Sequence, residues 1–321
     1  MANEQLMKNL RHGLLCYCIV VLTKFLRMLP RGSAISFMRG IGLAAFHVLR
    51  SRRRRTIGNL SLAFGQEKSP SEIHEIARQV FLNFSIFAAD AIRIPELIRN
   101  GLDGLIEVKG LKNLDELSGN HKGAIVLTAH FGNWELLGAW LAWKGYKIKA
   151  VGAPNNNEKL NKMILEARNS AGYHSIERGT ATREIVRALA SGYSIGVLID
   201  QATRAKGVFI KFFNHWAHTP VGPVKLAEKY GRKIIPIFIR LTDDHTYLVE
   251  VKEPLPLLFT GDKRRDLVLN TQICSEACEK MIRKHPEQWL WMMRRWKKQP
   301  DGHAAGMLEM NSKRSYALQR S

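Results

Sequence analysis

Residues 124–135 read Ala-Ile-Val-Leu-Thr-Ala-His-Phe-Gly-Asn-Trp-Glu, and they contain the clearest structural pattern in the chain. Its first six residues form an apolar run, rich in β-branched side chains, of the length expected for a fully buried strand. The Gly-containing segment after the run predicts a turn, and residues 134–143 then have the length and period of a helix. A buried strand therefore delivers an imidazole, His130, and a carboxylate, Glu135, to its end, with His130 at the turn before the helix.

The same alternation extends along the chain. Strands are predicted at residues 106–108, 124–128, 148–151, 194–199 and 234–239, and helices near 132–144, 156–171, 180–191 and 220–230. Strands interleaved with helices indicate an α/β fold with a mostly parallel sheet flanked by helices. Active sites in such sheets collect where strands end, and His130 and Asp200 each follow a predicted strand. A capping box at Ser69 and Glu72 predicts the start of an earlier helix.

The spacing of His130 and Glu135 is weak evidence by itself, because His245 and Glu250 show the same spacing. His245 and Glu250 bracket a predicted strand, where side chains five positions apart point to opposite faces. At the turn we expect the ring of His130 to lean toward Glu135, which would fix the tautomer and stabilise the imidazolium. A neutral imidazole so held takes the proton of an acceptor hydroxyl, as acyl transfer to an alcohol requires. We expect direct attack by that hydroxyl, and the alternative is a purely structural histidine.

Further motifs follow in order: Asp200-Gln201, residues 207–213 with 219–223, and residues 285–291 before the basic run 294–297. From about residue 50 to 298 the chain thereby resembles the bacterial lipid A biosynthesis acyltransferases. The resemblance implies a membrane-bound enzyme on the cytoplasmic face of the bacterial inner membrane. Such an enzyme moves a fatty acyl chain from acyl carrier protein to a hydroxyacyl chain of a phosphorylated lipid A precursor.

His130 and Glu135 match the catalytic His-x4-acid motif of that family. The sequence departs from the family pattern at two positions. Ala202 follows Asp200-Gln201 where the family often has a polar or acidic residue, and Met293 stands where a His commonly precedes the Arg pair. Both departures bear on the identity of the acceptor more than on the reaction type.

Six further residues are expected to bind substrate: Asn133, Arg178, Asp200, Gln201, Arg294 and Arg295. Asp200 ends a predicted strand, so it either orients a substrate group or caps the loop. The guanidinium fork of Arg178 suits an acceptor phosphate, although an isolated Arg is more often a plain surface residue. Arg294 and Arg295 lie among tryptophans, in a segment that suits a membrane interface or a nucleic-acid groove.

The chain has 321 residues and a net charge of +21. Residues 1–60 carry eleven Lys and Arg against one acid, and residues 281–321 carry nine against three. This excess indicates anionic partners: nucleic acid, anionic lipids, or acidic proteins and phosphorylated substrates. An uncharged apolar run, residues 13–23, lies beside the N-terminal basic residues, and a nucleic-acid module has no need of it. We therefore expect a membrane, acyl carrier protein and a phosphorylated lipid as partners, and no nucleic acid.

The apolar run is shorter than the ~20 residues that span hydrocarbon. It either extends to Pro30 with Lys24 and Arg27 snorkelling, or lies in the membrane interface, and residues 33–49 offer a second membrane-facing stretch. We expect membrane-anchoring or interfacial helices at 1–50, an acyltransferase domain at 51–298 and a flexible tail at 299–321. The four arginines at 52–55 should stay on the cytoplasmic side.

Three other interpretations stay open. The acceptor is a lysophospholipid or another glycolipid; or the chain is a basic nucleic-acid-associated protein; or it is a catalytically inactive membrane scaffold. The four cysteines lack disulfide or zinc spacing, and no metal or cofactor motif is present, so we expect neither a metal nor a cofactor.

Overall fold

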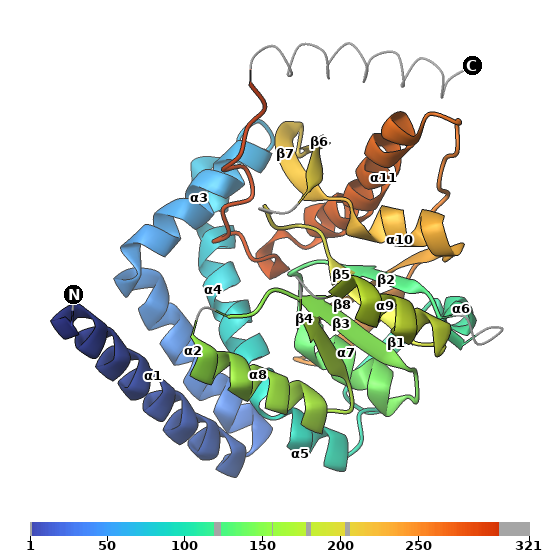
Figure 1. Ribbon diagram of the computed structural model, residues 1–321. Helices are drawn as coiled ribbons and strands as arrows, with labels where there is room; N and C mark the ends of the chain where they lie inside the picture. The colour runs from blue at the N-terminus through green and yellow to red at the C-terminus, as the bar shows by residue number, and fades with distance from the viewer. Residues whose placement is uncertain (1, 119–122, 156, 178–180, 203–205, 302–321) are drawn as a thin grey trace.

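A computed structural model describes residues 2–118, 123–155, 157–177, 181–202 and 206–301 (Figure 1). The chain begins with α1 (Ala2–Met28), α2 (Arg31–Val48), α3 (Arg50–Phe64) and α4 (Pro70–Ile92). Figure 1 shows these helices together on one side of the molecule, beside the sheet. The predicted capping box is confirmed, because Ser69 Oγ accepts from the amide of Glu72 while the Glu72 carboxylate accepts from the amide of Ser69.

The centre of the molecule is a seven-stranded sheet with the order β1-β9-β8-β2-β5-β3-β4. Its strands are β1 (Ile106–Lys109), β2 (Ile125–Thr128), β3 (Ile148–Gly152), β4 (His174–Glu177), β5 (Ser194–Leu198), β8 (Ile234–Leu241) and β9 (Tyr247–Val251). Five of the six neighbouring pairs are parallel, and β8 with β9 is antiparallel. The prediction of an α/β fold with a mostly parallel sheet is confirmed.

Helices cover both faces of this sheet. They are α5 (Ile94–Arg99), α6 (Asp115–Ser118), α7 (Trp134–Trp143), α8 (Glu158–Ser170), α9 (Ala181–Ala190), α10 (Gly222–Tyr230) and α11 (Lys263–Lys284), with short 3-10 turns η1 (Leu111–Leu114) and η3 (Pro286–Gln288). Strand β2 shows why two layers form, since its residues alternate between two hydrophobic cores. Leu127 packs in the core that includes α11, and Val126 packs in the core that includes Leu137 of α7.

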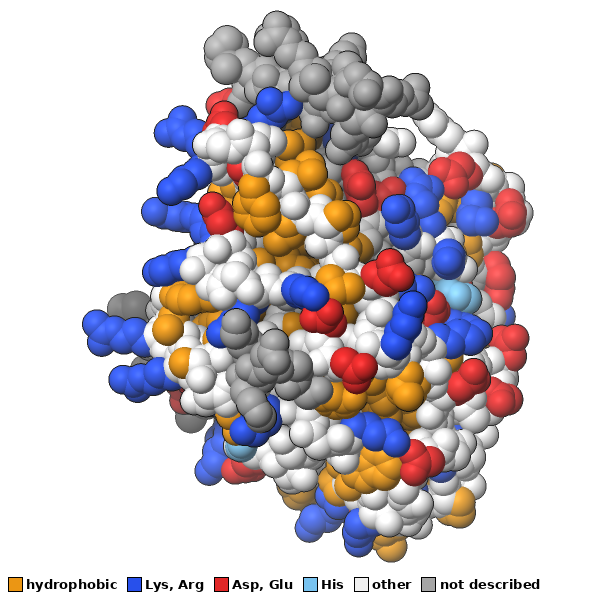
Figure 2. Space-filling view, turned by 90° about the vertical axis from the view of Figure 1, so that its right-hand side faces the viewer, with side chains coloured by type: hydrophobic (Ala, Val, Ile, Leu, Met, Phe, Trp, Pro, Cys, Tyr) orange, Lys and Arg blue, Asp and Glu red, His pale blue; other side chains and the backbone are white. Residues whose placement is uncertain are grey.

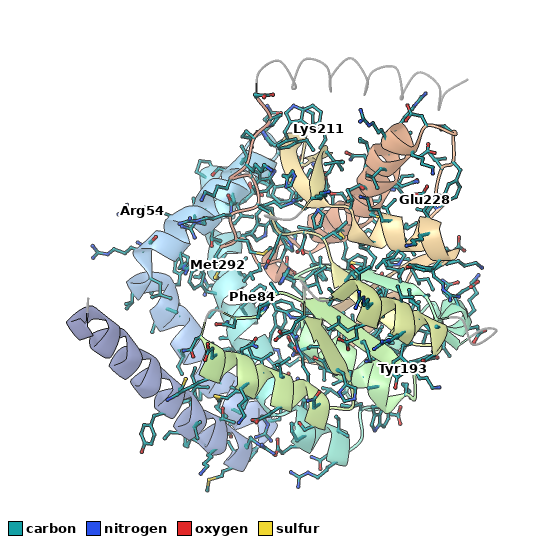
Figure 3. All side chains as sticks on the ribbon, in the orientation of Figure 1. Arg54, Phe84, Tyr193, Lys211, Glu228 and Met292 are labelled. Carbon is teal, nitrogen blue, oxygen red and sulfur yellow. The ribbon has the colours of Figure 1, made fainter. Side chains whose placement is uncertain are left out.

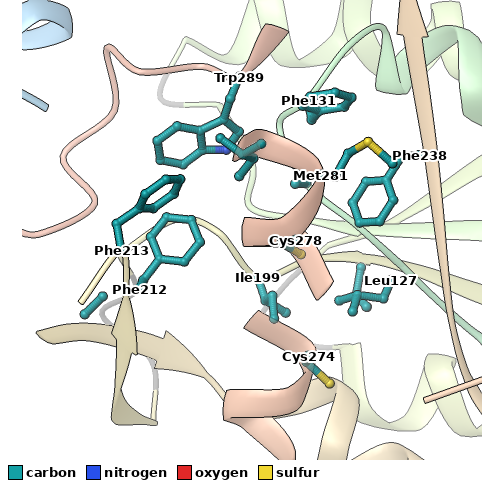
Figure 4. Close-up of a cluster of buried hydrophobic side chains, with 14 of the residues drawn as sticks. Leu127, Phe131, Ile199, Phe212, Phe213, Phe238, Cys274, Cys278, Met281 and Trp289 are labelled. Carbon is teal, nitrogen blue, oxygen red and sulfur yellow. The ribbon is translucent and has the colours of Figure 1, made fainter. Parts of the chain in front are cut away.

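A separate hairpin and residues 285–296 complete the larger core. The hairpin is β6 (Gly207–Phe212) paired antiparallel with β7 (His215–Pro220). Residues 285–296, which we call the C-terminal segment, then run back toward β2. Figure 4 shows Phe212, Phe213 and Trp289 grouped beside Cys278 of α11. The cysteines Cys274 and Cys278 are buried and unpaired, as expected for ordinary packing residues.

The N-terminal helices share their packing with the sheet domain. Ile35 of α2 lies in the same core as Phe87 of α4, and Met38 packs in a smaller cluster with Ala89. In the part of the chain that the structure describes, no helix alone has the length and hydrophobicity to cross a membrane. Helices α2 and α3 reach that threshold as a pair, but the bend between them is 86°.

Candidate active site

His130 and Asp200 are brought together by the register of two neighbouring strands. Thr128 of β2 pairs with Leu198 of β5 in a parallel ladder, and His130 and Asp200 each come two residues after these strands end. Matching positions beyond two parallel strands emerge at the same edge of the sheet. The contact between these residues, 70 positions apart in sequence, is therefore a direct result of the strand pairing.

Asp200 binds His130 twice. The ring Nδ1 of His130 lies 2.8 Å from Asp200 Oδ1, and the backbone amide of His130 donates to Oδ2 at 2.7 Å. The indole Nε1 of Trp289 also donates to Oδ2, at 2.7 Å. Burial acts to raise the pKa of Asp200, but the charge of His130 and these three hydrogen bonds hold it below its ordinary value. Asp200 is therefore an ionised acceptor, and Nδ1 of His130 carries the proton.

The other ring nitrogen of His130 faces the open side of the site. His130 Nε2 lies 2.9 Å from the amide nitrogen of Gln201, and an amide nitrogen can only donate. Nε2 is therefore an acceptor in the same tautomer that Asp200 requires. The ring of Trp134 packs edge-on against the imidazole at a centroid distance of 5.0 Å. His130 is thus oriented from two sides with a basic lone pair on Nε2.

Glu135 differs from expectation, because its carboxylate is bound away from His130. Arg168 of α8 donates to both oxygens of Glu135, at 2.9 and 2.5 Å, and the hydroxyl of Tyr173 donates at 2.5 Å. Burial acts to raise the pKa of Glu135, yet the hydrogen bonds and charge of Arg168 keep it below its ordinary value. The prediction that Glu135 orients the imidazole is wrong, because the carboxylate that contacts the ring is that of Asp200. Glu135 instead joins α7 to α8.

Arg168 and Tyr173 are site residues that the sequence reasoning missed. Arg168 also donates to the hydroxyl of Ser175, at 2.9 Å. Tyr173 lies across Gly138 of α7, where an added Cβ would come within 2.8 Å of the tyrosine ring. No local pattern marks either residue. The one available signal was the need of a buried carboxylate for a cationic partner.

The remaining predicted substrate residues fall in different environments. Asn133 is buried and caps α7 by accepting from the amide of Leu136, so its side chain is committed to the fold. Arg295 is 1% exposed and donates to His218 O and Thr219 Oγ1, which places it in the core rather than at a substrate. Arg294 is exposed. Arg178 lies outside the described residues.

A Gly-x-Ser-x-Gly run does occur, at residues 192–196, but its serine is not a nucleophile in this fold. Ser194 is buried at the start of β5, the end of the strand opposite to Asp200. Its hydroxyl accepts from the amide of Ala124 at 3.0 Å. Direct attack by a substrate hydroxyl remains the scheme that the geometry allows.

A cavity of about 280 Å³ opens beside His130. Its more exposed lining side chains are polar and include His130, Glu135, Arg168 and Gln201. Its buried lining is mostly apolar and includes Val126, Leu137, Leu141 and Ile148, together with Thr128 and Tyr173. Gly196 lies on the floor, on β5, with nothing nearer than 3.7 Å to the position of an added Cβ. The cavity suits a hydrocarbon chain whose reactive end stays at the mouth. In the described part of the chain, no three His, Cys, Asp or Glu side chains gather to hold a metal ion.

A histidine oriented by a buried carboxylate, beside a cavity with both polar and apolar walls, suits a base that serves the transfer of an apolar group. The chain belongs to the bacterial lipid A biosynthesis acyltransferase family, whose model matches residues 3–298, and it is an acyltransferase. It is 25% identical to lipid A biosynthesis acyltransferase 2 of Shigella flexneri, over 83% of this chain and 84% of that protein. It is 23% identical to a phosphatidylinositol mannoside acyltransferase of Mycolicibacterium smegmatis, over 74% and 77%. With the lipid A biosynthesis palmitoleoyltransferase of Escherichia coli it shares 27% identity, over 62% and 64%.

Proposed function

We propose that this acyltransferase moves a fatty acyl chain from the thioester of acyl carrier protein to a hydroxyl of a phosphorylated lipid A precursor, in lipopolysaccharide biosynthesis. The observation that carries the proposal is the orientation of His130. Its Nδ1 proton is bound by buried Asp200, and its Nε2 lone pair meets Gln201, which lines the same cavity as His130. A base placed in this way can activate a hydroxyl next to a carbonyl whose acyl chain lies in the cavity.

The reaction follows from these positions. The acceptor hydroxyl replaces the Gln201 amide at Nε2, and its oxygen attacks the thioester carbonyl carbon while its proton passes to Nε2. The resulting imidazolium lies against the Asp200 carboxylate, which stabilises it. Collapse of the tetrahedral intermediate breaks the carbon–sulfur bond, and the imidazolium returns the proton to the departing thiolate. An ester and a free thiol leave, and His130 is neutral again.

Glu135 has a different task in this scheme. Because it binds Arg168 and Tyr173, we propose that it acts by holding these side chains at the cavity wall rather than by touching His130. Arg168 lines the same cavity as His130. Glu135 thus keeps a positive charge fixed near the reacting groups.

The basic surface supports a phosphorylated acceptor and an acidic donor protein. Burial, followed by repulsion from Arg294 and Arg52, lowers the pKa of Arg55, so positive charge is concentrated where α3 meets the C-terminal segment. Figure 3 shows Arg54 on the same helix. In Figure 2, which views the molecule from the right-hand side of Figure 1, Lys and Arg side chains follow the left-hand edge. Anions are attracted to such surfaces.

The acceptor can be tested directly with the full-length protein. Acyl carrier protein and coenzyme A thioesters are offered as donors, and a phosphorylated lipid A precursor, a phosphatidylinositol mannoside and a lysophospholipid as acceptors. We expect transfer from acyl carrier protein to the lipid A precursor, lost in His130→Ala. Preferred acylation of the mannoside, which the mycobacterial relative makes the second candidate, would overturn the choice of acceptor. Absence of transfer to any acceptor would overturn the function.

We further propose that the chain is held at the cytoplasmic face of the inner membrane by its N-terminal helices. Exposed apolar side chains recur at helical spacing on α1, at Tyr17, Val21 and Phe25, and on α2, at Phe37 and Ile41. The rings of Phe25 and Phe37 touch at a centroid distance of 5.2 Å, so the two faces are continuous. Such a surface buries apolar area in the interface of a membrane.

The bend between α2 and α3 adds charge to this surface. Val48 is 74% exposed and Leu49 48% exposed, and the exposed arginines Arg50, Arg52 and Arg54 follow. Apolar burial resists salt whereas the attraction of arginine to anionic head groups does not. We expect the protein to stay on phosphatidylglycerol-containing vesicles in high salt. The double variant Val48→Glu with Leu49→Glu should be released by salt, while Phe259→Glu, an exposed site between β9 and α11, should not. Release of the unmodified protein by salt alone would overturn the proposal.

A further inference from the structure

The C-terminal segment is attached to the turn that carries His130. The amide of Leu290 donates to the carbonyl of His130 at 3.0 Å, and the amide of Gly132 donates to the carbonyl of Gln288 at 2.9 Å. The side chain of Gln288 both donates to and accepts from the backbone of Leu241 on β8, at 2.8 Å each. The segment is therefore fixed to the sheet on both sides of Trp289.

The hydrogen bond from Trp289 completes the environment of Asp200. Asp200 and Trp289 are both buried, with exposures of 1% and 0%. Asp200 Oδ2 accepts from the indole of Trp289 and from the backbone amide of His130, which leaves Oδ1 directed at the imidazole. A buried carboxylate needs such donors to remain charged. The nearby buried Arg295 donates instead to His218 and Thr219 of β7.

We infer that Trp289 is a positioning residue for catalysis: its indole N–H holds the Asp200 carboxylate so that Oδ1 faces the Nδ1 proton of His130. This inference deepens the proposed function and rests on it. Trp289 touches neither substrate nor the reacting atoms, and acts through Asp200. Its packing with Phe212, Trp291 and Trp296 fixes the indole plane from three directions.

The expected effect on pH dependence has a definite sign. Burial favours the neutral form of Asp200, and the bond from Trp289 is among the contacts that lower its pKa. Removing that bond therefore raises the pKa of Asp200. Asp200 supports catalysis only in its ionised form. As the solution is acidified, the variant therefore loses this form, and its activity, at a higher pH. The acid limb of the activity profile should move upward in pH.

The tryptophan cluster supplies a matched control. Trp291 is also buried at 0% exposure, and its indole donates at 2.6 Å to the backbone carbonyl of Pro286 rather than to a carboxylate. Trp289→Phe and Trp291→Phe each remove one buried indole N–H from the same cluster. Only the first change removes a hydrogen bond to Asp200, and the phenyl ring of Trp291→Phe keeps an aromatic neighbour for Trp289.

The experiment compares kcat, KM, the pH profile and unfolding stability of the two variants. We expect Trp289→Phe to lower kcat by about 10- to 100-fold, the range for one hydrogen bond to a charged group, with KM nearly unchanged and the acid limb moved upward. Trp291→Phe should lose stability but keep kcat and the pH profile. Equal kcat and equal pH profiles in the two variants would overturn the inference.

Two further measurements keep the test decisive. If Trp289→Phe does not fold, benzothienylalanine at position 289 keeps the indole shape and removes the N–H alone. The NMR signal of the His130 Nδ1 proton provides a readout that needs no substrate. It should shift when Trp289 is changed and stay in place when Trp291 is changed. This readout holds even if no acyl transfer is detected. A signal that does not move in the Trp289 variant refutes the role of Trp289, and a signal that moves supports it.

Discussion

Replacement of Asp200 by asparagine tests the site most directly, because the change keeps shape and removes charge. A carboxamide offers one acceptor oxygen and one donor nitrogen. Two donors, the amide of His130 and the indole of Trp289, meet at Oδ2, so the oxygen of Asp200→Asn must occupy that position. The new NH2 group then faces His130 Nδ1. The ring can accept this bond only by moving its proton to Nε2.

A proton on Nε2 removes the lone pair that takes the acceptor's proton. The same change of tautomer in a serine protease lowers kcat by about 10⁴-fold, which corresponds to about 5.5 kcal/mol of barrier. We therefore expect Asp200→Asn to lose about four orders of magnitude in acyl transfer. Mass spectrometry of the acylated product, at equal concentrations of folded protein, measures the rate. Nitrogen-15 NMR of the imidazole reports the tautomer independently.

The control is Asp266→Asn, a buried carboxylate near the start of α11 that accepts from the amide and hydroxyl of Thr260. It should lose stability without a comparable loss of rate. A rate within tenfold of the unmodified enzyme in Asp200→Asn, with the proton still on Nδ1, would refute the assignment of Asp200 as the orienting carboxylate.

Three other changes have defined outcomes. His130→Ala should lower acyl transfer by on the order of 10² to 10⁴ while His245→Ala does little, as judged by rates at equal folded protein. Asp90→Asn should lower the free energy of unfolding by about 3–5 kcal/mol, as measured by urea denaturation. The reason is that Arg31 loses its buried ionic partner and the hydroxyl of Tyr247 loses a charged acceptor. Arg294→Ala should raise KM for the phosphorylated acceptor more than it lowers kcat, and a dephosphorylated acceptor should remove the difference.

The sequence predicts those parts of the site that depend on strand ends. His130 and Asp200 each follow an apolar run, and parallel strands bring such positions to one edge. The neighbour relation of β2 and β5 was not predictable in detail, because α7, β3, α8, β4 and α9 lie between them in sequence. The site edge could be expected, but the pairing of the two residues could not.

Glu135 shows where local reasoning stops. Its place next to the start of α7 was predicted, yet the direction of its carboxylate is set by Arg168 on α8 and Tyr173 just before β4. A short-range motif suggests that the partner lies within the motif. A buried carboxylate instead pairs with the cationic side chain that the fold places next to it, even when that residue is distant in sequence. Arg295 illustrates the same limit, since an arginine in a basic run is expected at the surface and here lies inside the core.

The attachment of the C-terminal segment also determines the order in which the protein acquires its properties during synthesis. A chain folds as it emerges from its N-terminus. The N-terminal helices therefore leave the ribosome long before Trp289 and Leu290, whose contacts with Asp200 and His130 finish the site. While these helices are being made, His130 still lacks the contacts that support it in the folded site. The base is therefore complete only after the C-terminal segment has been synthesised and has packed beside β2.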